Sequence, residues 1–212
     1  MRGQFITFEG GEGAGKSTQV KALVARLRDQ GLEVVQTREP GGSGGAEALR
    51  ELLVTGDAGR WSPISETLMM YAARASHLEQ TIRPALERGA WVVCDRFSDS
   101  TRAYQGAGGG VSPAFIDQID QVVVGKDQPD MTLILDMPVE AGLKRALSRG
   151  DNENRFESKG IEFHNKLRQG FIDRAATDTL RYHIVDADQT IPELADNIWR
   201  LISGRWPALK GA

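Results

Sequence analysis

The sequence has little of what disulfide-bonded, zinc-binding or membrane-spanning proteins need. Its 212 residues include one cysteine and three histidines, so no intramolecular disulfide can form and no zinc-ligand spacing exists. No apolar run approaches the roughly 18 residues of a membrane-spanning helix, and the short apolar start does not resemble a signal peptide. The net charge of −3 gives no basic field for a nucleic-acid polymer or an anionic membrane. We therefore expect a cytoplasmic protein that binds neither.

Five short apolar segments, rich in β-branched residues, alternate with helical segments. The expected strands are 4–9, 32–37, 90–95, 132–137 and 182–187, and Cys94 in the third is expected to be a buried structural thiol. The expected helices are 16–30, 65–82 (ending near Pro84), 139–149, 161–178 and 192–203. This alternation predicts an α/β fold with a parallel sheet covered on both faces. Because no repeat or linker is present, we expect one domain over residues 1–212.

Three stretches interrupt the alternation. Residues 40–45 and 106–110 are glycine-rich, and residues 149–160 are polar and charged. Mobile surface loops and loops that border a ligand site have the same composition, so both alternatives stay open at this point.

Residues 8–18, FEGGEGAGKST, carry the strongest single motif. Residues 10–17 match G-x-x-x-x-G-K-[ST] between an expected strand and an expected helix, the context of a phosphate-binding P-loop. Glycines let successive N–H groups point inward around phosphate oxygens, and the helix N-terminus adds its positive dipole end. Lys16 is expected to reach the β- and γ-phosphates of ATP, and Ser17 to bind Mg²⁺. The predicted ATP-binding residues are Gly10, Gly11, Glu12, Gly13, Ala14, Gly15, Lys16, Ser17 and Thr18.

A P-loop does not name the phosphoryl acceptor. The D-x-x-G and N-K-x-D tetrapeptides of GTPase switches are missing from the sequence. Arg38 and Arg96 follow expected strands, and in a parallel sheet ligands collect at the carboxyl ends of the strands. Two guanidinium groups there could clamp an acceptor's phosphate, or each could pair with a neighbouring acid, Glu39 or Asp95. Asp95 itself suits a Mg²⁺-water contact or a helix cap.

Five segments together resemble the bacterial type of thymidylate kinase. They are F-x-x-F-E-G-x-E-G-A-G-K-S-T from residue 5, R-E-P-G-G from 38, Y-A-A-R-A from 71, D-R-F-x-x-S-x-x-A-Y-Q-G from 95 and N-R-F-E from 154. The resemblance runs in order through most of the chain. It implies a P-loop NTPase fold with a five-stranded parallel sheet flanked by helices, a mobile lid and a homodimer. It also implies ATP- and Mg²⁺-dependent phosphorylation of dTMP to dTDP, a step that supplies DNA precursors.

The resemblance also implies roles for individual residues. Glu12 would face the deoxyribose 3′-hydroxyl, and Tyr104 would lie where a ribose 2′-hydroxyl would go. Arg38 and Arg96 would hold the dTMP phosphate, Arg96 also acting in catalysis beside Lys16, and Asp95 would help Ser17 to position Mg²⁺. The expected substrate-binding residues are Glu12, Arg38, Met70, Arg74, Arg96, Ser100, Thr101, Tyr104 and Gln105, with Arg74 and Thr101 at the thymine edge and Ser100 beside them.

The sequence departs from the family pattern at one position. Met70 stands where related sequences often have a phenylalanine that stacks on the base; a thioether can pack on an aromatic face, although Met69 and Met70 could also simply fill the core.

Some family members have an arginine within the P-loop. In this sequence the corresponding segment is Glu12-Gly13-Ala14, which contains no arginine. The missing positive charge is expected from a lid at about 149–160, which supplies Arg149, Arg155 and Lys159 and has Gly150 and Gly160 near its two ends. The alternative for this stretch is a solvated charged loop.

Two other functions remain open from the sequence. A deoxynucleoside kinase would phosphorylate an uncharged hydroxyl and would not need two arginines for an acceptor phosphate. A regulatory nucleotide-binding module would bind without turnover, which the lid arginines and Asp95 argue against. Competition between dTMP and thymidine as acceptors distinguishes a dTMP kinase from a deoxynucleoside kinase. An assay of ADP release distinguishes an enzyme from a regulatory module.

Overall fold

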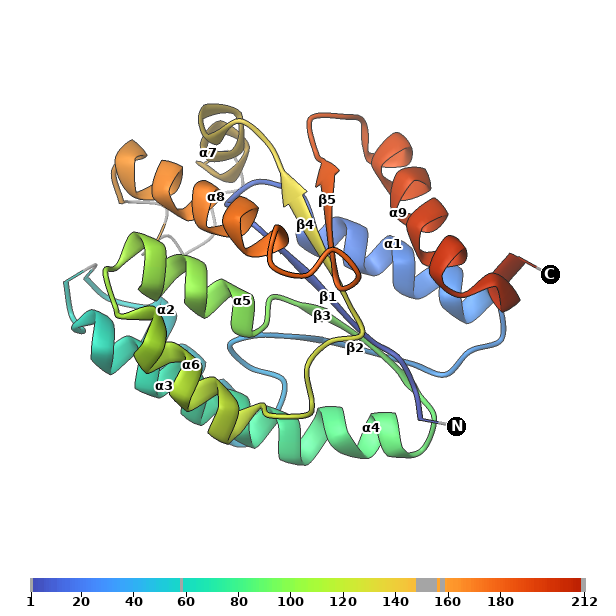
Figure 1. Cartoon of the computed structure of the whole chain (residues 1–212), viewed down its shortest axis with the longest axis horizontal. Helices are drawn as coiled ribbons and strands as arrows, with labels where there is room; N and C mark the ends of the chain where they lie inside the picture. Colours follow the sequence, from blue (N-terminus) through green and yellow to red (C-terminus); the bar gives the residue numbers. More distant parts are fainter. Residues whose placement is uncertain (1, 58, 148–155, 157–158, 211–212) are drawn as a thin grey trace.

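The structure, a computed structural model, describes residues 2–57, 59–147, 156 and 159–210. Its centre is a parallel sheet with strand order β2-β3-β1-β4-β5 (Figure 1). The strands are β1 (Phe5–Gly10), β2 (Val34–Arg38), β3 (Trp91–Asp95), β4 (Met131–Asp136) and β5 (Tyr182–Asp186). Each lies within two residues of the range expected from the sequence, which confirms the predicted five-stranded parallel sheet.

Helices cover both faces of the sheet, as the apolar strands require. On one face, α1 (Lys16–Asp29) and α9 (Ile191–Arg205) pack against Ile6, Phe8 and Leu133. On the other face lie α3 (Pro63–His77), α4 (Arg83–Glu87), α6 (Pro113–Val123) and α8 (Ile161–Ala175). Cys94 points into this second layer and is fully buried, and burial raises the pKa of its thiol. The expectation of a buried structural thiol is confirmed.

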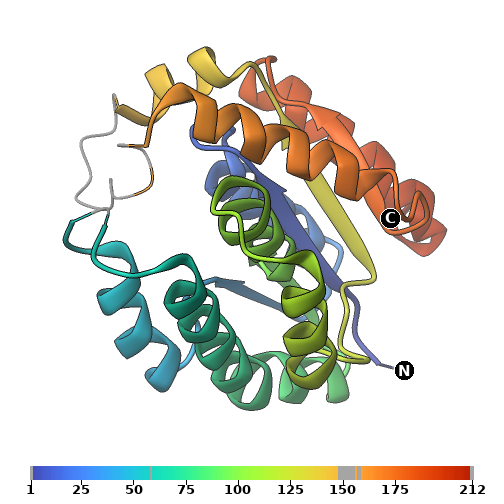
Figure 2. The ribbon, with the colours of Figure 1, turned by 60° about the vertical axis from the view of Figure 1, so that its left-hand side comes forward.

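The sequence did not predict α2 (Gly44–Val54), α5 (Ser98–Thr101), α6 or the π-helical turn η2 (Arg102–Gly108). The glycine-rich stretches expected to be loops are therefore partly helical. One of these glycines allows close packing: a Cβ at Gly108 would lie 2.5 Å from the ring of Phe163 on α8, so α8 can cross η2 closely (Figure 2).

The helix expected to end near Pro84 continues instead. After α3 it runs through a π-helical turn, η1 (Leu78–Ile82), into α4, and Pro84 stands in the first turn of α4. A proline inside a continuous helix removes one N–H donor and crowds the preceding turn, and here the wider π-helical turn η1 lies directly before it. The other helical elements are α7 (Val139–Leu147) and the 3₁₀ turn η3 (Pro207–Lys210).

The carboxyl ends of the central strands meet at one edge of the sheet. Phe8 of β1 and Arg38 of β2 both lie in register with Asp95 of β3. The loops that follow β1, β2 and β3 therefore converge on one place. Among the described residues, no helix has the length and apolar character needed to cross a membrane.

Candidate active site

The loop between β1 and α1 has the geometry of a phosphate cradle. Gly15 directly precedes α1 with φ 85°, and Gly13 has φ 69°, the left-handed region that glycine adopts readily. A Cβ at Gly13 would lie 1.9 Å from the carbonyl oxygen of Gly142 on α7, so this glycine is also required by close packing. A Cβ at Gly15 would meet nothing within 4 Å, which leaves open space in front of the helix N-terminus. Backbone N–H groups at such a terminus attract phosphate.

Lys16 lies within the curve of its own loop. Its side chain is largely buried, and Nζ donates to the carbonyl oxygens of Gly10 at 3.1 Å and Gly11 at 2.7 Å. Burial lowers the pKa of Lys16 to about 8, and the charge of Arg96 acts in the same direction. A phosphate group placed in the loop would supply the negative charge that restores the full charge of this ammonium.

Ser17 and Asp95 come together as the sequence predicts. The Ser17 hydroxyl donates to Oδ2 of Asp95 at 2.5 Å, although the residues are 78 positions apart. A hydroxyl and one carboxylate suit Mg²⁺, which prefers oxygen ligands and usually completes its shell with water and substrate phosphates. Among the described residues, no group of three or more acidic, histidine or cysteine side chains forms a separate metal site. The two residues therefore fit Mg²⁺ bound together with a nucleotide.

A cavity of about 230 Å³ opens beside the P-loop, between the ends of β2 and β3 and helix α3. It brings together most of the residues predicted to bind ATP, metal or acceptor. Those that line it are Glu12, Gly13, Gly15, Lys16, Ser17, Arg38, Met70, Arg74, Asp95, Arg96, Ser100, Thr101, Tyr104 and Gln105. Met70 lines the cavity, and its stacking on the base stays a prediction.

Four of the predicted ATP-binding residues do not line this cavity. Gly10 and Gly11 border a small neighbouring pocket beneath the loop, Ala14 is buried in the core, and Thr18 is exposed in the first turn of α1. Arg149 and Arg155, the predicted catalytic lid residues, lie outside the described residues, as does most of the expected lid. Lys159 is described, and its Nζ lies 4.5 Å from the centroid of the Phe163 ring.

Arg96, Glu12 and Tyr104 form a tight polar group on the cavity wall. Arg96 donates to Glu12 Oε1 at 3.0 Å and to the carbonyl oxygen of Gly10, while the Tyr104 hydroxyl donates to the same Glu12 oxygen at 2.5 Å. Burial by itself would raise the pKa of Glu12, but the charges of Arg96 and Lys16 outweigh it and hold the pKa at about 2. Glu12 is therefore an ionised carboxylate within reach of a bound ligand.

The backbone of Arg96 adopts φ 69°, a left-handed conformation that non-glycine residues seldom take. Backbone outliers of this kind cluster at functional sites, where surrounding contacts hold them. Here the Arg96 N–H donates to the carbonyl oxygen of Phe8, and the guanidinium lies 4.8 Å from the centroid of the Tyr104 ring. These contacts aim a positive side chain at the cavity from the end of β3.

Arg38 reaches the cavity from β2, and its pairing differs from that of Arg96. It forms an ion pair at 3.0 Å with Glu47 of α2, and both side chains are about half exposed. Exposed pairs of this kind contribute little to stability. Arg38 can therefore exchange this partner for a ligand at small cost. The acids that pair with the two arginines are Glu47 and Glu12, not the sequence neighbours Glu39 and Asp95.

Arg74 is the most deeply buried cation at the cavity. Its Nε donates to Glu39 Oε2 at 2.8 Å and its Nη2 to the Thr101 hydroxyl at 3.1 Å, and the guanidinium lies between the rings of Tyr71 and Phe97. Its Nη1 makes no hydrogen bond to any described residue. A buried N–H group without a partner is costly, so Nη1 marks a place for an acceptor atom of a ligand.

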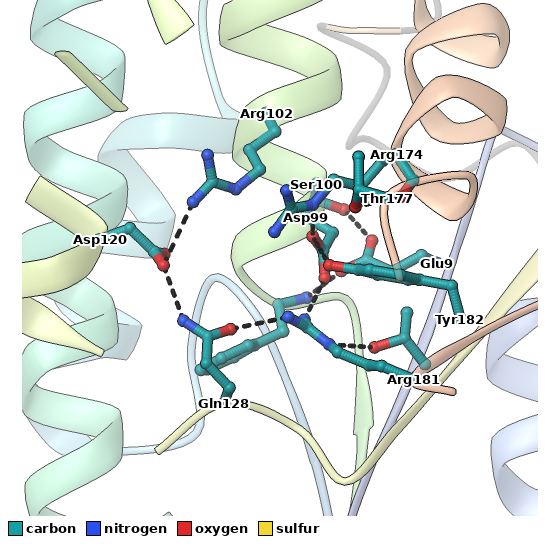
Figure 3. Close-up of polar contacts among 12 residues, drawn as sticks. Glu9, Asp99, Ser100, Arg102, Asp120, Gln128, Arg174, Thr177, Arg181 and Tyr182 are labelled. Carbon is teal, nitrogen blue, oxygen red and sulfur yellow. Dashed lines mark hydrogen bonds and ion pairs between the residues drawn. The ribbon is translucent and has the colours of Figure 1, made fainter. Parts of the chain in front are cut away.

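A buried polar network supports the helix that carries Ser100 and Thr101 (Figure 3). Asp99 is fully buried; it accepts hydrogen bonds from Arg174 at 3.0 Å and from Tyr182 at 2.8 Å, and it also pairs with Arg181. Close to Asp99, Ser100 is hydrogen-bonded to the Glu9 carboxyl at 2.5 Å. These contacts tie α5 to β1, α8 and β5.

Sequence reasoning missed several residues at this site. Glu39 was considered only as a partner for Arg38, yet it holds Arg74; Arg50, Val54 and Phe156 also line the cavity. Phe156 packs edge-on against Tyr104, with ring centroids 5.4 Å apart. The R-E-P-G-G and N-R-F-E segments contain two of these residues, but linear spacing does not reveal which side chains meet.

Comparison with known proteins agrees with this geometry. Residues 8–198 match the family model described as thymidylate kinase. A thymidylate kinase of Caulobacter vibrioides is 57% identical over 187 residues, covering 88% of this chain and 89% of that protein. One from Magnetococcus marinus is 48% identical over 206 residues, covering 97% and 98%. The crystal structure of thymidylate kinase from Ehrlichia chaffeensis superposes with a TM-score of 0.79 at 32% identity, covering 95% of this chain and all of that one. The chain belongs to the thymidylate kinase family.

Proposed function

We propose that the chain phosphorylates dTMP to dTDP with ATP as donor, and that the cavity at the ends of β1, β2 and β3 is where the two nucleotides meet. This is the reaction of its family. The observation that carries the assignment of the site is the single cavity in which P-loop residues and the arginines Arg38, Arg74 and Arg96 converge. A deoxynucleoside kinase would have less use for so many cations on the acceptor side.

On the donor side, the N–H groups of residues 13–17 bind and orient the phosphates of ATP. Lys16 places its ammonium at the β- and γ-phosphates, where negative charge is spread during transfer. Ser17 and Asp95 are the residues that would hold Mg²⁺, whose charge neutralises the phosphate oxygens when it is bound. Because Nζ of Lys16 already lies inside the loop, little rearrangement of the chain is needed.

On the acceptor side, Arg38 and Arg96 hold the phosphate of dTMP. Arg96 is held more firmly than Arg38 because its side chain is mostly buried and has several partners, whereas Arg38 is half exposed. Holding the acceptor phosphate next to Lys16 turns the reaction into a transfer between two fixed groups, which is the larger part of catalysis in phosphoryl transfer.

The base and the sugar are recognised by the rest of the lining. The unpartnered Nη1 of Arg74 donates to a carbonyl of thymine beside Thr101, and Ser100, Gln105 and Met70 complete the base pocket. Glu12 accepts from the 3′-hydroxyl. The Tyr104 ring, backed by Phe156, occupies the space beside C2′.

We further propose that the chain forms a homodimer. Ile64 and Leu68 stand one turn apart on the outer face of α3 with 55% and 51% of their surfaces exposed, which suits a covering partner surface. Light scattering coupled to size exclusion tests this directly, and a monomeric mass at micromolar concentration would contradict it.

The decisive test of the function is ADP release from ATP and Mg²⁺ with a panel of acceptors. We expect turnover with dTMP, much less with dCMP and the ribose counterpart of dTMP, and essentially none with thymidine. Turnover with thymidine in preference to dTMP would instead identify a nucleoside kinase. ATP binding without any turnover would identify a regulatory module.

A further inference from the structure

A chain of buried hydrogen bonds runs behind the cavity to Arg74. The Thr37 hydroxyl lies 2.7 Å from Nε2 of His77, and Nδ1 of His77 lies 2.9 Å from Oε1 of Glu39. The other Glu39 oxygen, Oε2, accepts from Nε of Arg74 at 2.8 Å. We call Thr37, His77, Glu39 and Arg74 the base relay. It joins β2 to α3 and ends at the guanidinium of Arg74, which lines the cavity.

The chemistry of Glu39 fixes the direction of these hydrogen bonds. A carboxylate only accepts, so Nδ1 of His77 carries a hydrogen and donates to Glu39. In the neutral ring, Nε2 then accepts from the Thr37 hydroxyl. Each Glu39 oxygen has one donor, His77 on one side and Arg74 on the other. The carboxylate is held between them and cannot turn freely.

The surroundings of His77 allow it no other position. The ring is fully buried, and a Cβ at Gly42 would lie 2.4 Å from its Nε2 and 2.5 Å from the Thr37 hydroxyl. The loop that carries Gly42 is itself tied down, because the Thr81 hydroxyl donates to the Gly42 carbonyl oxygen at 2.6 Å. His77 therefore lies against a fixed backbone and does not line the cavity.

We propose that His77 is a positioning residue for recognition of the acceptor base, acting through Glu39 to leave Arg74 with N–H groups directed at the cavity. The proposal rests on the acceptor site proposed above. His77 occupies one Glu39 oxygen, so the carboxylate binds Arg74 through Nε alone. Nη2 stays with Thr101 and Nη1 stays available to a base carbonyl.

Loss of the His77 donor would change this arrangement. Oε1 of Glu39 would then be a buried carboxylate oxygen without a partner, which is unfavourable. The nearest remedy is for Glu39 to take two N–H groups of Arg74 in the side-by-side geometry that guanidinium and carboxylate prefer. Arg74 would turn away from Thr101, and the base would lose a directed donor. A base carbonyl would then be favoured less strongly over an amino group.

Two amide variants of His77 distinguish its hydrogen bond to Glu39 from its hydrogen bond to Thr37. His77→Asn places an amide about where Nδ1 lies and can still donate to Glu39, whereas His77→Gln places it farther out, near Thr37. We expect His77→Gln to raise KM for dTMP roughly ten- to hundredfold, the range for losing a hydrogen bond to a charged group. The kcat and the KM for ATP should change by less than about threefold, because the phosphate groups are untouched.

Base discrimination distinguishes a positioning residue from a purely structural one, because substitution of a purely structural residue would not change the preference between bases. We expect the ratio of kcat/KM for dTMP over dCMP to fall about tenfold in His77→Gln and to recover in His77→Asn. Ser62→Ala is the matched control, since it removes the N-cap hydrogen bond of α3, the helix that carries His77, without touching the relay. It should lower Tm while leaving this ratio unchanged.

The outcomes distinguish the proposal from its premise. Wild-type protein that fails to turn over dTMP contradicts the proposed function itself. Normal wild-type turnover with unchanged KM and ratio in His77→Gln overturns only the positioning role, as does an equal fall of the ratio in Ser62→Ala. If His77→Gln does not fold, Thr37→Val decides: a smaller loss of the same ratio supports the relay, and an unchanged ratio overturns it.

Discussion

The phosphate-binding loop consists of eight consecutive residues, 10–17, whereas the acceptor side of the same cavity draws its lining from α2, α3, η2 and the ends of β2 and β3. The loop works mainly through backbone N–H groups and two left-handed glycines. The acceptor side works through side chains, and each of these is held by another: Arg96 by Glu12, Arg74 by Glu39, Ser100 by Glu9.

This difference has a consequence for mutation. A backbone cradle depends on few side chains, so on the donor side we expect large losses only where a charge meets the moving phosphoryl group. The acceptor side should respond in smaller steps of affinity and specificity. The four predictions that follow test this contrast.

The largest effect is expected from the lid arginines that the family resemblance implies. Arg149→Ala and Arg155→Ala, made separately, should lower kcat by about 10³-fold and change KM for dTMP far less, because they meet charge that develops during transfer. Steady-state kinetics with saturating ATP measure this. Lys166→Ala, which removes an exposed partner of Glu162 on α8, is the control. Normal turnover in both arginine variants would mean that the segment is a solvated loop and that the P-loop draws its charge from elsewhere.

Next in size is the loss of the P-loop lysine. Lys16→Met keeps the length of the side chain and removes its charge from a buried position, so kcat should fall by at least about 10²-fold. Lys21→Met, an exposed change on the same helix, is the matched control. Turnover within about threefold of wild type would remove Lys16 from the mechanism.

The contrast between the two sides also explains what the sequence could reveal. The P-loop motif is local, so its residues, the following helix and the buried β1 strand could all be predicted from one segment. The five strands were predictable for a related reason, since burial on both faces leaves continuous apolar runs. The shared metal site of Ser17 and Asp95 was implied by the family resemblance, and the rule that parallel strands end at one edge is its physical reason.

The parts that could not be predicted depend on contacts across layers. Helix α2 begins with Gly44 and Gly45, and composition alone suggested a loop, but Ser43 precedes the helix and Ala46 and Leu53 on its inner face are buried. The role of Glu39 is not visible in R-E-P-G-G, because Arg74 lies 35 residues away. A pattern identifies a residue of the site more readily than it identifies its partner.

A medium effect is expected for the sugar, on the acceptor side. The Tyr104 ring fills the space proposed for C2′, so a 2′-hydroxyl would be desolvated against it without a partner. Tyr104→Ala should reduce the preference for dTMP over its ribose counterpart about tenfold. Tyr104→Phe keeps the ring and loses only the bond to Glu12, so the preference should remain.

Glu12 provides the second half of this test. Glu12→Ala should weaken discrimination against acceptors that lack the 3′-hydroxyl, because in wild type such acceptors lose the hydrogen bond that the 3′-hydroxyl donates to the Glu12 carboxylate. Measurements of kcat/KM for the three acceptors on each variant are sufficient. An unchanged deoxy-to-ribo ratio in Tyr104→Ala would contradict the steric role of the ring, whatever Glu12 does.

The smallest effect concerns stability and comes from Glu9, beneath the acceptor side. Its carboxyl is fully buried, accepts from the Phe97 N–H at 2.8 Å and is bonded to Ser100. Burial, with the nearby charge of Asp99, raises the pKa of Glu9 to about 8. Between pH 4.5 and 8 the folded protein therefore keeps a proton that the unfolded chain has lost. The free energy of unfolding must fall as the pH rises through that window.

Glu9→Gln should remove this part of the pH dependence, since an amide resembles the protonated carboxyl in shape and cannot ionise. We expect the variant to be close to wild type at pH 5 and relatively more stable at pH 8, with kcat at neutral pH little changed. Calorimetry at both pH values reads the difference, because about 1 kcal/mol shifts Tm by roughly 2–4 °C in a chain of this size. The comparison must be between the two proteins, since other carboxyl groups titrate in both. A Tm difference between variant and wild type that is the same at pH 5 and pH 8 would show that Glu9 does not carry its proton into the neutral range.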